Sequence, residues 1–265
     1  MRLFGTNGIR GVVGKDLTPD LALKVGRAVA TWRGPHLLGL GRDTRTSGPM
    51  LRDALVSGLL ASGARVLDVG VLPSPALQYY VKARGLAGGV IVTASHNPPE
   101  WNGIKVVDAR GMEIAREDEE TIEEAIASGA FAIPAWRDVG GVSMASDGPR
   151  VYMDAVAARV DRAAIAKRRP FVVVDPGNGA ACGTTPQLLR VLGCRVTTIH
   201  AQPDGGFPGR NPEPTAANLE ELRRLVPVLG ADLGIAHDGD ADRAAVLTEH
   251  GEFVDGDRLL AWLAG

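Results

Sequence analysis

The chain has 265 residues, enough for one large domain or two domains of ordinary size, each with its own core. Its hydrophobic content of 45% and charged content of 23% are those of a soluble globular protein. A net charge of -2 and an aromatic content of 5% argue against nucleic acid as a partner, because that function needs a basic surface and stacking side chains.

The sequence also argues against a membrane or secreted protein. No apolar run approaches the ~20 residues that cross a bilayer, and the N-terminus lacks the apolar segment of a signal peptide. Cys182 and Cys194 have neither the spacing of a metal site nor that of a redox motif. We therefore expect a cytoplasmic protein with two reduced, buried thiols and no membrane partner.

Short predicted strands and helices alternate through the first half of the chain. Thr18-Pro19 is a typical helix start, and the apolar stripe that follows predicts a helix as far as Trp32. The other elements expected here are strands over 37–40, 65–69, 89–92 and 103–107, helices that begin at Ser47 and Pro73, and a solvated acidic helix over 117–127. Such alternation predicts a mainly parallel sheet flanked by helices.

The glycine- and serine-rich stretch 140–149 is the best candidate for a domain boundary. Beyond it we expect helices over 151–165, 185–192 and 216–226, and strands over 171–174, 195–199, 231–236 and 244–247. The prediction is therefore an α/β fold of two consecutive domains, each a mainly parallel or mixed sheet flanked by helices. The domains are expected at 1–148 and 149–254, with 255–265 as the start of a third.

Chemically capable side chains follow the buried strand that ends at Val92. Ser95, His96 and Asn97 precede two prolines, and Lys105 lies on the strand that returns. Ligands of open α/β sheets bind outside such strand ends. Ser95 is therefore a candidate nucleophile, with His96 or Lys105 to transfer protons. The alternative is that Ser95 and Asn97 only form a turn, but the rigid prolines and the returning lysine favour a functional site.

A second candidate site is the acidic loop that contains Asp238, Asp240 and Asp242. Three carboxylates at alternate positions repel one another unless a cation lies among them. Ligation by oxygen alone suits Mg²⁺, Mn²⁺ or Ca²⁺ better than zinc. An EF-hand does not fit, because Arg243 occupies the position that requires glycine. An exposed, capped turn is a poor alternative, because the acids directly follow a buried strand.

Both loops resemble motifs of the α-D-phosphohexomutases, the family of phosphoglucomutase, phosphomannomutase and phosphoglucosamine mutase. Residues 93–99 with 102–105 resemble the phosphoserine loop of that family. Residues 238–243 resemble its Asp-Gly-Asp-x-Asp-Arg metal loop, and residues 8–11 are similar to its N-terminal Gly-Ile-Arg-Gly segment. The resemblance covers the whole chain.

The resemblance implies that Ser95 carries a phosphoryl group in the active form. It implies that Asp238, Asp240 and Asp242 bind Mg²⁺ together with Ser95 or its phosphate. The phosphoryl group would pass to a hexose monophosphate to give a hexose 1,6-bisphosphate, which returns its other phosphate to Ser95. The expected activity is thus interconversion of hexose 1-phosphate and 6-phosphate.

The same resemblance assigns roles to the basic residues. Arg10 and Arg243 would neutralise the oxygens of the phosphoryl group. Lys105 would be the general acid and base toward the sugar hydroxyl, with His96 as the second candidate.

Enzymes of this family usually have four domains, whereas this chain stops near the start of the third. We expect intact chemical machinery but weak sugar binding and poor turnover, with the C-terminal domains as possible partners. Two other classes stay open: a non-catalytic module that binds a metal or a phosphosugar, and a phosphosugar phosphatase. The choice of hexose is not decided by the sequence, although Asn7 leans toward the phosphoglucosamine mutase branch.

Overall fold

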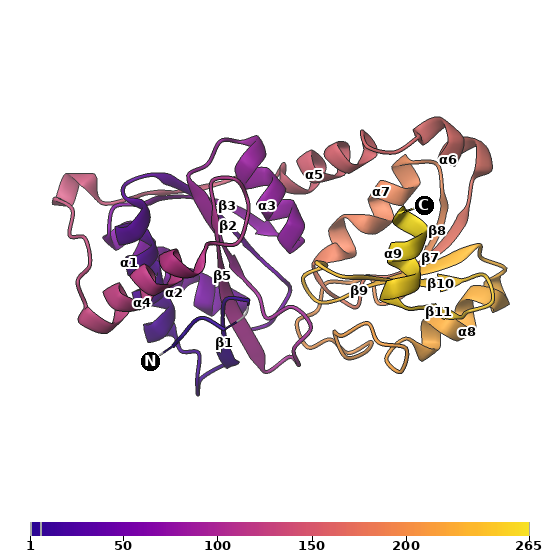
Figure 1. The fold of residues 1–265 in the computed structure, drawn as a ribbon, viewed down its shortest axis with the longest axis horizontal. Coiled ribbons are helices and arrows are strands. Elements are labelled where there is room, and N and C mark those ends of the chain that lie inside the picture. The colour runs from indigo at the N-terminus through magenta and orange to yellow at the C-terminus, as the bar shows by residue number, and fades with distance from the viewer. Residues whose placement is uncertain (1, 6, 265) are drawn as a thin grey trace. The chain divides into compact units, whose positions relative to one another are not determined.

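The computed structural model describes residues 2–5 and 7–264, so that Thr6 of the N-terminal glycine-rich segment lies outside the described residues. The chain divides into two compact units (Figure 1). The first unit consists of Met1–Ala94 and Glu100–Gly148, and the second consists of Ser95–Pro99 and Pro149–Gly265.

The first unit contains a mixed sheet. Its strands lie in the order β1 (Ile9–Val12), β5 (Trp101–Asp108), β4 (Gly88–Val92), β2 (Leu37–Arg42), β3 (Arg65–Val71) and β6 (Val142–Met144). Strand β2 pairs in parallel with β3 and β4, and β3 pairs in parallel with β6. Strand β5 runs antiparallel to both β4 and β1.

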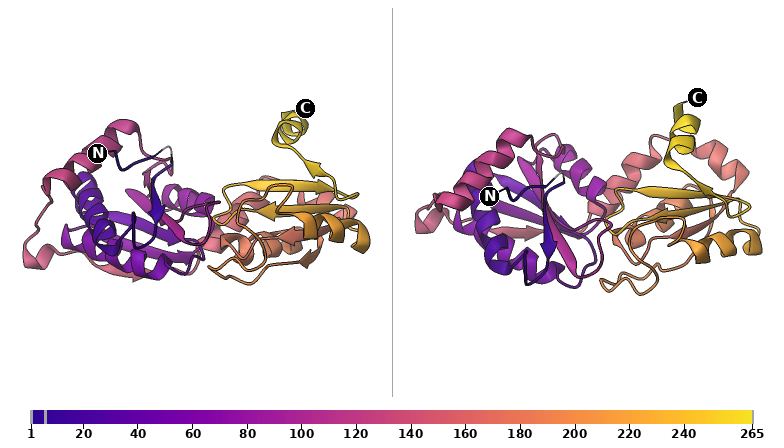
Figure 2. Two further views of the ribbon diagram at one scale, coloured as in Figure 1. Left: turned by 90° about the horizontal axis from the view of Figure 1, so that it is seen from below. Right: turned by 60° about the horizontal axis from the view of Figure 1, so that its bottom comes forward.

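Helices cover both faces of this sheet (Figures 1 and 2). They are α1 (Pro19–Arg33), α2 (Gly48–Ala61), α3 (Ser74–Ala83) and α4 (Arg116–Ser128), and η1 (Trp136–Asp138) is a short 3-10 turn. Leu38 and Leu40 of β2 share a core with residues of α1, α2 and α4. Side chains alternate along a strand, and Gly39 and Gly41 accordingly face Leu77 of α3 on the other side.

Helices α1 and α2 pack closely because each has a glycine at the crossing. A Cβ atom on Gly26 would lie 2.2 Å from the carbonyl oxygen of Leu55, and one on Gly58 would lie 2.1 Å from that of Leu23. As predicted, α1 is capped by Thr18, whose Oγ1 accepts a hydrogen bond of 3.2 Å from the backbone N–H of Leu21.

The second unit contains another mixed sheet. Its strands lie in the order β11 (Phe253–Val254), β10 (Ala244–Thr248), β9 (Leu233–His237), β7 (Phe171–Asp175) and β8 (Arg195–Thr198). Strand β7 is parallel to β8 and β9, whereas β10 is antiparallel to β9 and β11. The helices are α5 (Gly148–Ala157), α6 (Arg162–Arg168), α7 (Thr185–Val191), α8 (Glu220–Leu229), α9 (Gly256–Ala264) and the 3-10 turn η2 (Ala180–Gly183).

The predicted fold class, two α/β sheets flanked by helices, is confirmed. Two helix predictions were wrong in detail. The helix expected over 151–165 is divided into α5 and α6, because Asp161 caps a new helix by accepting a hydrogen bond of 2.9 Å from Ala164 N–H. The helix expected from residue 216 begins at Glu220, because the side chain of Asn218 closes a turn with the carbonyl of Glu213.

Helix α9 stands off the body of the second unit (Figure 2). The carboxylate of Asp255 caps it by accepting a hydrogen bond of 2.8 Å from Arg258 N–H. Leu260 and Trp262 on this helix are 67% and 59% exposed.

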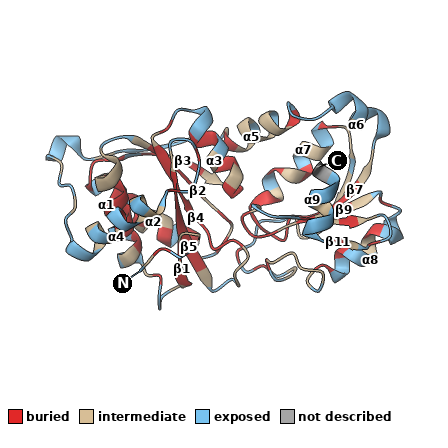
Figure 3. Ribbon diagram, in the orientation of Figure 1, coloured by how far each residue is buried: buried red, intermediate tan, exposed pale blue. Residues whose placement is uncertain are grey.

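Burial follows the sheets, whose strands are mostly covered while the helices turn polar faces outward (Figure 3). Cys182 and Cys194 are free thiols, as predicted, but each is only half-buried. Desolvation raises the pKa of Cys182 to about 12. Within the described part of the chain, no helix combines the length and the apolarity that a transmembrane span requires.

Candidate active site

Ser95 lies in the short loop between β4 (ending at Val92) and β5 (beginning at Trp101). Both strands belong to the first unit, whereas Ser95–Pro99 belongs by its contacts to the second. Ser95 is 1% exposed, and its φ of 52° lies in the left-handed region. Residues other than glycine rarely adopt this conformation, which costs on the order of 1–3 kcal/mol and is concentrated at functional sites.

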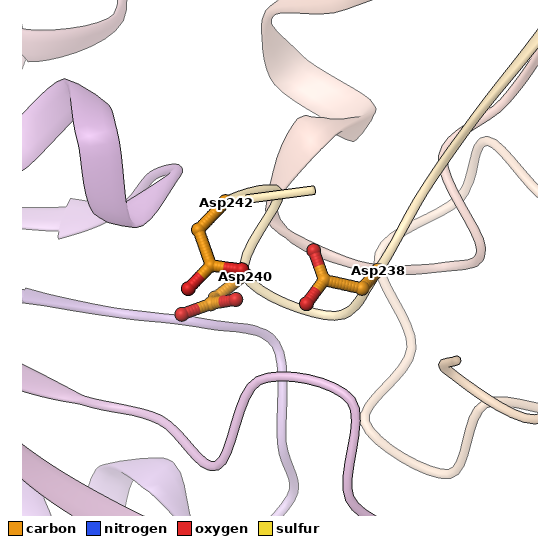
Figure 4. Close-up of side chains that lie close together, drawn as sticks. All are labelled: Asp238, Asp240 and Asp242. Carbon is orange, nitrogen blue, oxygen red and sulfur yellow. The ribbon is translucent and has the colours of Figure 1, made fainter. Parts of the chain in front are cut away.

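The three aspartates lie in the loop between β9 and β10 (Figure 4). Ligand oxygens of Asp238, Asp240 and Asp242 all lie within 4.8 Å of one another. Asp238 and Asp240 are fully buried, and Asp242 is exposed. Two backbone N–H groups shape the loop: Arg243 N–H donates to the Asp238 side chain at Oδ1 over 3.2 Å, and Ala241 N–H donates to the Asp238 carbonyl over 3.2 Å.

The serine and the acidic loop are in direct contact within the second unit. Ser95 Oγ donates a hydrogen bond of 2.7 Å to Asp238 Oδ2. His96 Nδ1 lies 3.4 Å from the same hydroxyl oxygen. A Cβ atom on Gly239 would lie 2.6 Å from the Ser95 carbonyl oxygen, so the loops approach this closely only because residue 239 is glycine.

The pKa of Asp238 is shifted by burial and by the neighbouring carboxylates. Burial raises the pKa of Asp238 to about 8, and the charges of Asp240 and Asp242 act in the same direction. The hydrogen bonds from Ser95 and from Arg243 N–H oppose this shift. Three carboxylates so close together are costly without a counter-charge, and a cluster of oxygen ligands fits a hard divalent cation. The residues present therefore fit a metal ion.

Arg243 lies at the edge of the acidic loop. Its side chain is 52% exposed, with Nη1 3.9 Å from Glu213 Oε1 and Nε 4.0 Å from Asp242 Oδ1. A cavity of about 360 Å³ lies beside it, bordered also by Phe253 and by Leu259 of α9. Arg243 is thus accessible to a ligand in this cavity.

His237 has a structural role in the acidic loop that the sequence did not indicate. Its Nδ1 lies 3.0 Å from the Arg243 carbonyl oxygen, and its Nε2 lies 3.0 Å from Thr185 Oγ1. Because a carbonyl only accepts, Nδ1 carries the proton and Nε2 accepts from the threonine hydroxyl. Desolvation lowers the pKa of His237, which favours this neutral form. The ring joins the beginning of the acidic loop to its end.

Arg10 and Lys105 belong to the first unit. Arg10 lies on β1, opposite Gly103 of β5, and Lys105 is buried on β5 with 3% exposure. Gly8 permits this pairing: its φ is 81°, and a Cβ there would lie 2.7 Å from the carbonyl oxygen of Ile104. No strand was predicted here, because β1 is only four residues long and lies in a glycine-rich segment.

A buried ion pair contacts the residues that precede and follow the serine loop. Asp43 and Arg45 are each 0% exposed, with Arg45 Nε 3.0 Å from Asp43 Oδ2. Thr93 Oγ1 donates to the same oxygen over 2.7 Å, and Arg45 Nη1 donates to the carbonyl of Trp101 over 2.9 Å. This arginine therefore braces its own loop through Asp43. The contacts to Thr93 and Trp101 were not predicted.

Comparison with known proteins gives consistent matches over both units. The family model for phosphoglucomutase/phosphomannomutase α/β/α domain I matches residues 1–132, and the model for domain II matches residues 150–251. A phosphoglucomutase/phosphomannomutase of Thermococcus kodakarensis is 48% identical over 268 residues, a match that covers 99% of this chain and 59% of the relative.

Two further matches agree. A probable phosphoglucosamine mutase of Methanopyrus kandleri is 46% identical over 260 residues, which covers 98% of this chain and 57% of the relative. The crystal structure of a phosphoglucomutase/phosphomannomutase family protein from Burkholderia thailandensis superposes with a TM-score of 0.89 at 32% identity, covering 99% of this chain and 58% of that one. The chain thus spans less than two thirds of the length of each protein.

Proposed function

The chain belongs to the phosphoglucomutase/phosphomannomutase family, and on that premise we propose that it interconverts hexose 1-phosphate and hexose 6-phosphate by phosphoryl transfer through Ser95. The names of the relatives support transfer to a sugar over the two alternatives, a phosphatase and a non-catalytic binding module. We also propose domains at 1–148 and 149–254, with 255–265 as the start of a third.

One observation carries this proposal: the hydrogen bond of 2.7 Å from Ser95 Oγ to Asp238 Oδ2. A phosphoryl group on Ser95 adds a charge of about −1.5 to −2 beside three carboxylates. Such a group is compatible with Asp238, Asp240 and Asp242 only if a cation is shared between them. We propose Mg²⁺, which binds few carboxylates together with phosphate oxygens. When bound, it would neutralise the charge on the transferring group.

The transfer moves one phosphoryl group at a time. The P–O bond to Ser95 Oγ breaks while a bond forms to a free hydroxyl of the hexose monophosphate. Lys105 takes the proton of that hydroxyl, with His96 as the second candidate, since its Nδ1 lies 3.4 Å from Ser95 Oγ. Ser95 Oγ keeps the electron pair of the broken bond. It attacks the other phosphate of the bisphosphorylated sugar, and the sugar oxygen that leaves takes the proton back from Lys105.

The two arginines have charge-neutralising roles in this proposal. A guanidinium matches the geometry of phosphate oxygens. Arg243 is half-exposed beside the acidic loop, and Arg10 lies on the strand paired with the one that contains Lys105. We propose that both contact phosphate groups of the sugar or of the phosphoserine.

The test is an Mg²⁺-dependent exchange assay with glucose, mannose and glucosamine 1-phosphates and a hexose 1,6-bisphosphate primer. The wild-type chain should form some 6-phosphate, and Ser95→Ala should form none. Release of inorganic phosphate without isomerised sugar would indicate the phosphatase instead. Permanent absence of phosphate from Ser95 would indicate the binding module.

A further inference from the structure

Arg210, in the loop between β8 and α8, contacts the strand end that precedes the acidic loop. Its side chain is 5% exposed. Nε donates to Asp175 Oδ2 over 2.7 Å, while Nη2 donates to the carbonyl oxygens of Asp175 over 3.3 Å and His237 over 2.6 Å. Asp175 ends β7, and His237 ends the neighbouring strand β9, directly before Asp238. One guanidinium therefore joins two adjacent strand ends at the cation site.

Every N–H group of the Arg210 guanidinium donates a hydrogen bond. Nη1 donates to the carbonyl oxygens of Asn211 over 3.0 Å and Pro212 over 3.2 Å. With the three contacts above, five N–H groups meet five oxygen acceptors, which is the full capacity of a guanidinium. A lysine would offer its donors from a single atom and would lose the contacts on one side.

Gly177 makes room for this arrangement. Its φ is 58°, and a Cβ atom there would lie 2.7 Å from Arg210 Nη2. Its N–H donates to Asp175 Oδ1 over 2.8 Å, on the carboxylate that Arg210 contacts through the other oxygen. The tight turn after β7 is therefore shaped around the guanidinium.

The loop that contains Arg210 also supports the other side of Asp238. The Phe207 ring is buried, and its Cζ would lie 3.4 Å from a Cβ atom on Gly239. Gly239 in turn lies against the carbonyl of Ser95. This one loop thus contacts the residue before Asp238 through Arg210 and the residue after it through Phe207.

We propose that Arg210 is a positioning residue for the cation-binding carboxylates. It holds the backbone at His237, and so directs the Asp238 carboxylate toward Asp240 and Ser95. This inference rests on the proposed function, because it presumes that the aspartates bind a divalent cation. Partners outside the ligand shell typically change metal affinity 10- to 100-fold. Loss of the Arg210 fork should therefore weaken cation binding without removing any ligand.

The first test compares two glycine substitutions in the second unit. Gly177→Ala pushes a methyl group into the guanidinium of Arg210. Gly230→Ala imposes similar backbone strain, since its φ is 62°, but no atom lies within 4 Å of its Cβ position. Mn²⁺ binding to the metal-free chain is measured by calorimetry or electron paramagnetic resonance. We expect Gly177→Ala to raise the Kd about tenfold and Gly230→Ala to keep the wild-type Kd.

A second variant, Arg210→Lys, keeps the positive charge beside Asp175 but loses the fork, and it decides the question if Gly177→Ala does not fold. Its Kd for Mn²⁺ should rise, and hydrogen exchange should quicken at the Arg243 amide, which donates to Asp238. Wild-type Kd and exchange in both variants would overturn this inference alone. A wild-type chain that does not bind Mn²⁺ would overturn the proposed cation site as well, so the two failures are distinguishable.

Discussion

Ser95 Oγ lies 2.7 Å from Asp238 Oδ2, although 143 residues separate the two in the sequence. Ser95 has a left-handed backbone conformation in this contact, and Asp238 is fully buried. The Ser95 hydroxyl and the Asp238 carboxylate therefore form one site, and a substitution of either residue should alter the environment of the other.

Metal should stabilise the second unit. Because burial and two neighbouring charges oppose the ionised form of Asp238, a divalent cation relieves a cost that is present in the folded state alone. At a concentration of 100 times its Kd, a ligand of the folded state adds about 2.7 kcal/mol to the free energy of unfolding. We expect Mg²⁺ or Mn²⁺ to raise the melting temperature, and EDTA to reverse the rise.

The matched control for this effect is Asp240→Asn, which removes one proposed ligand and one negative charge. Its melting temperature should be insensitive to the cation. An equal rise in wild type and Asp240→Asn would show that the cation acts elsewhere on the chain.

Asp43→Asn should destabilise the first unit strongly. The substitution leaves the charge of Arg45 buried without its carboxylate, and breaking a buried pair costs about 3–5 kcal/mol. It also weakens the acceptor for Thr93 Oγ1, next to the serine loop. Urea denaturation measures the loss.

Asp53→Asn serves as the comparison, because Asp53 pairs with Arg52 at the surface and its side chain is 67% exposed. Exposed pairs contribute about 0–1 kcal/mol. If both variants lost the same small amount, the buried pair would not hold the segment as described.

Glu123 should make stability depend on acid pH. Desolvation alone would raise its pKa, but the hydrogen bonds from Phe4 and Leu3 N–H, together with Arg116, lower it below the ordinary value of 4.5. A lowered pKa means that the stabilisation is complete above pH 4.5 and is lost as the pH falls through the folded-state pKa.

Glu123→Gln should therefore be less stable than wild type at pH 7, by on the order of 1 kcal/mol, and the difference should shrink below pH 4.5. Thermal melts from pH 3 to pH 7 test this. Glu124 is an exposed neighbour on the same helix, and Glu124→Gln should have the same stability as wild type at every pH. A constant gap between Glu123→Gln and wild type at all pH values would contradict the assignment.

Local patterns in the sequence predicted most of the fold. The Thr18 cap, the apolar stripe of α1, the buried run of β4 and the alternating burial of β9 are each encoded by neighbouring residues. Strand β1 was missed because its pairing with β5 depends on residues about 90 positions away and on close approach at Gly8. The division between α5 and α6 was missed because the cap at Asp161 interrupts a continuous apolar pattern.

The candidate site was predicted to a similar extent. Ser95 and the three aspartates stand in recognisable motifs, so their chemistry was evident from residue types. The contacts that hold these residues in place were not evident from the sequence. Arg210 reaches acceptors on three separate segments, and no local spacing indicates such a fork. The backbone conformation of Ser95 likewise follows from long-range contacts and leaves no signal in the sequence.

The account depends most on Ser95 as the residue that carries the phosphoryl group. The direct measurement is to incubate the metal-free chain with a hexose 1,6-bisphosphate, with and without Mg²⁺, and to locate phosphate by phosphopeptide mass spectrometry. We predict phosphate on Ser95 only when Mg²⁺ is present, and none in Asp240→Asn. Phosphate on another residue, or an equal yield on Ser95 with the cation chelated, would contradict the central claim.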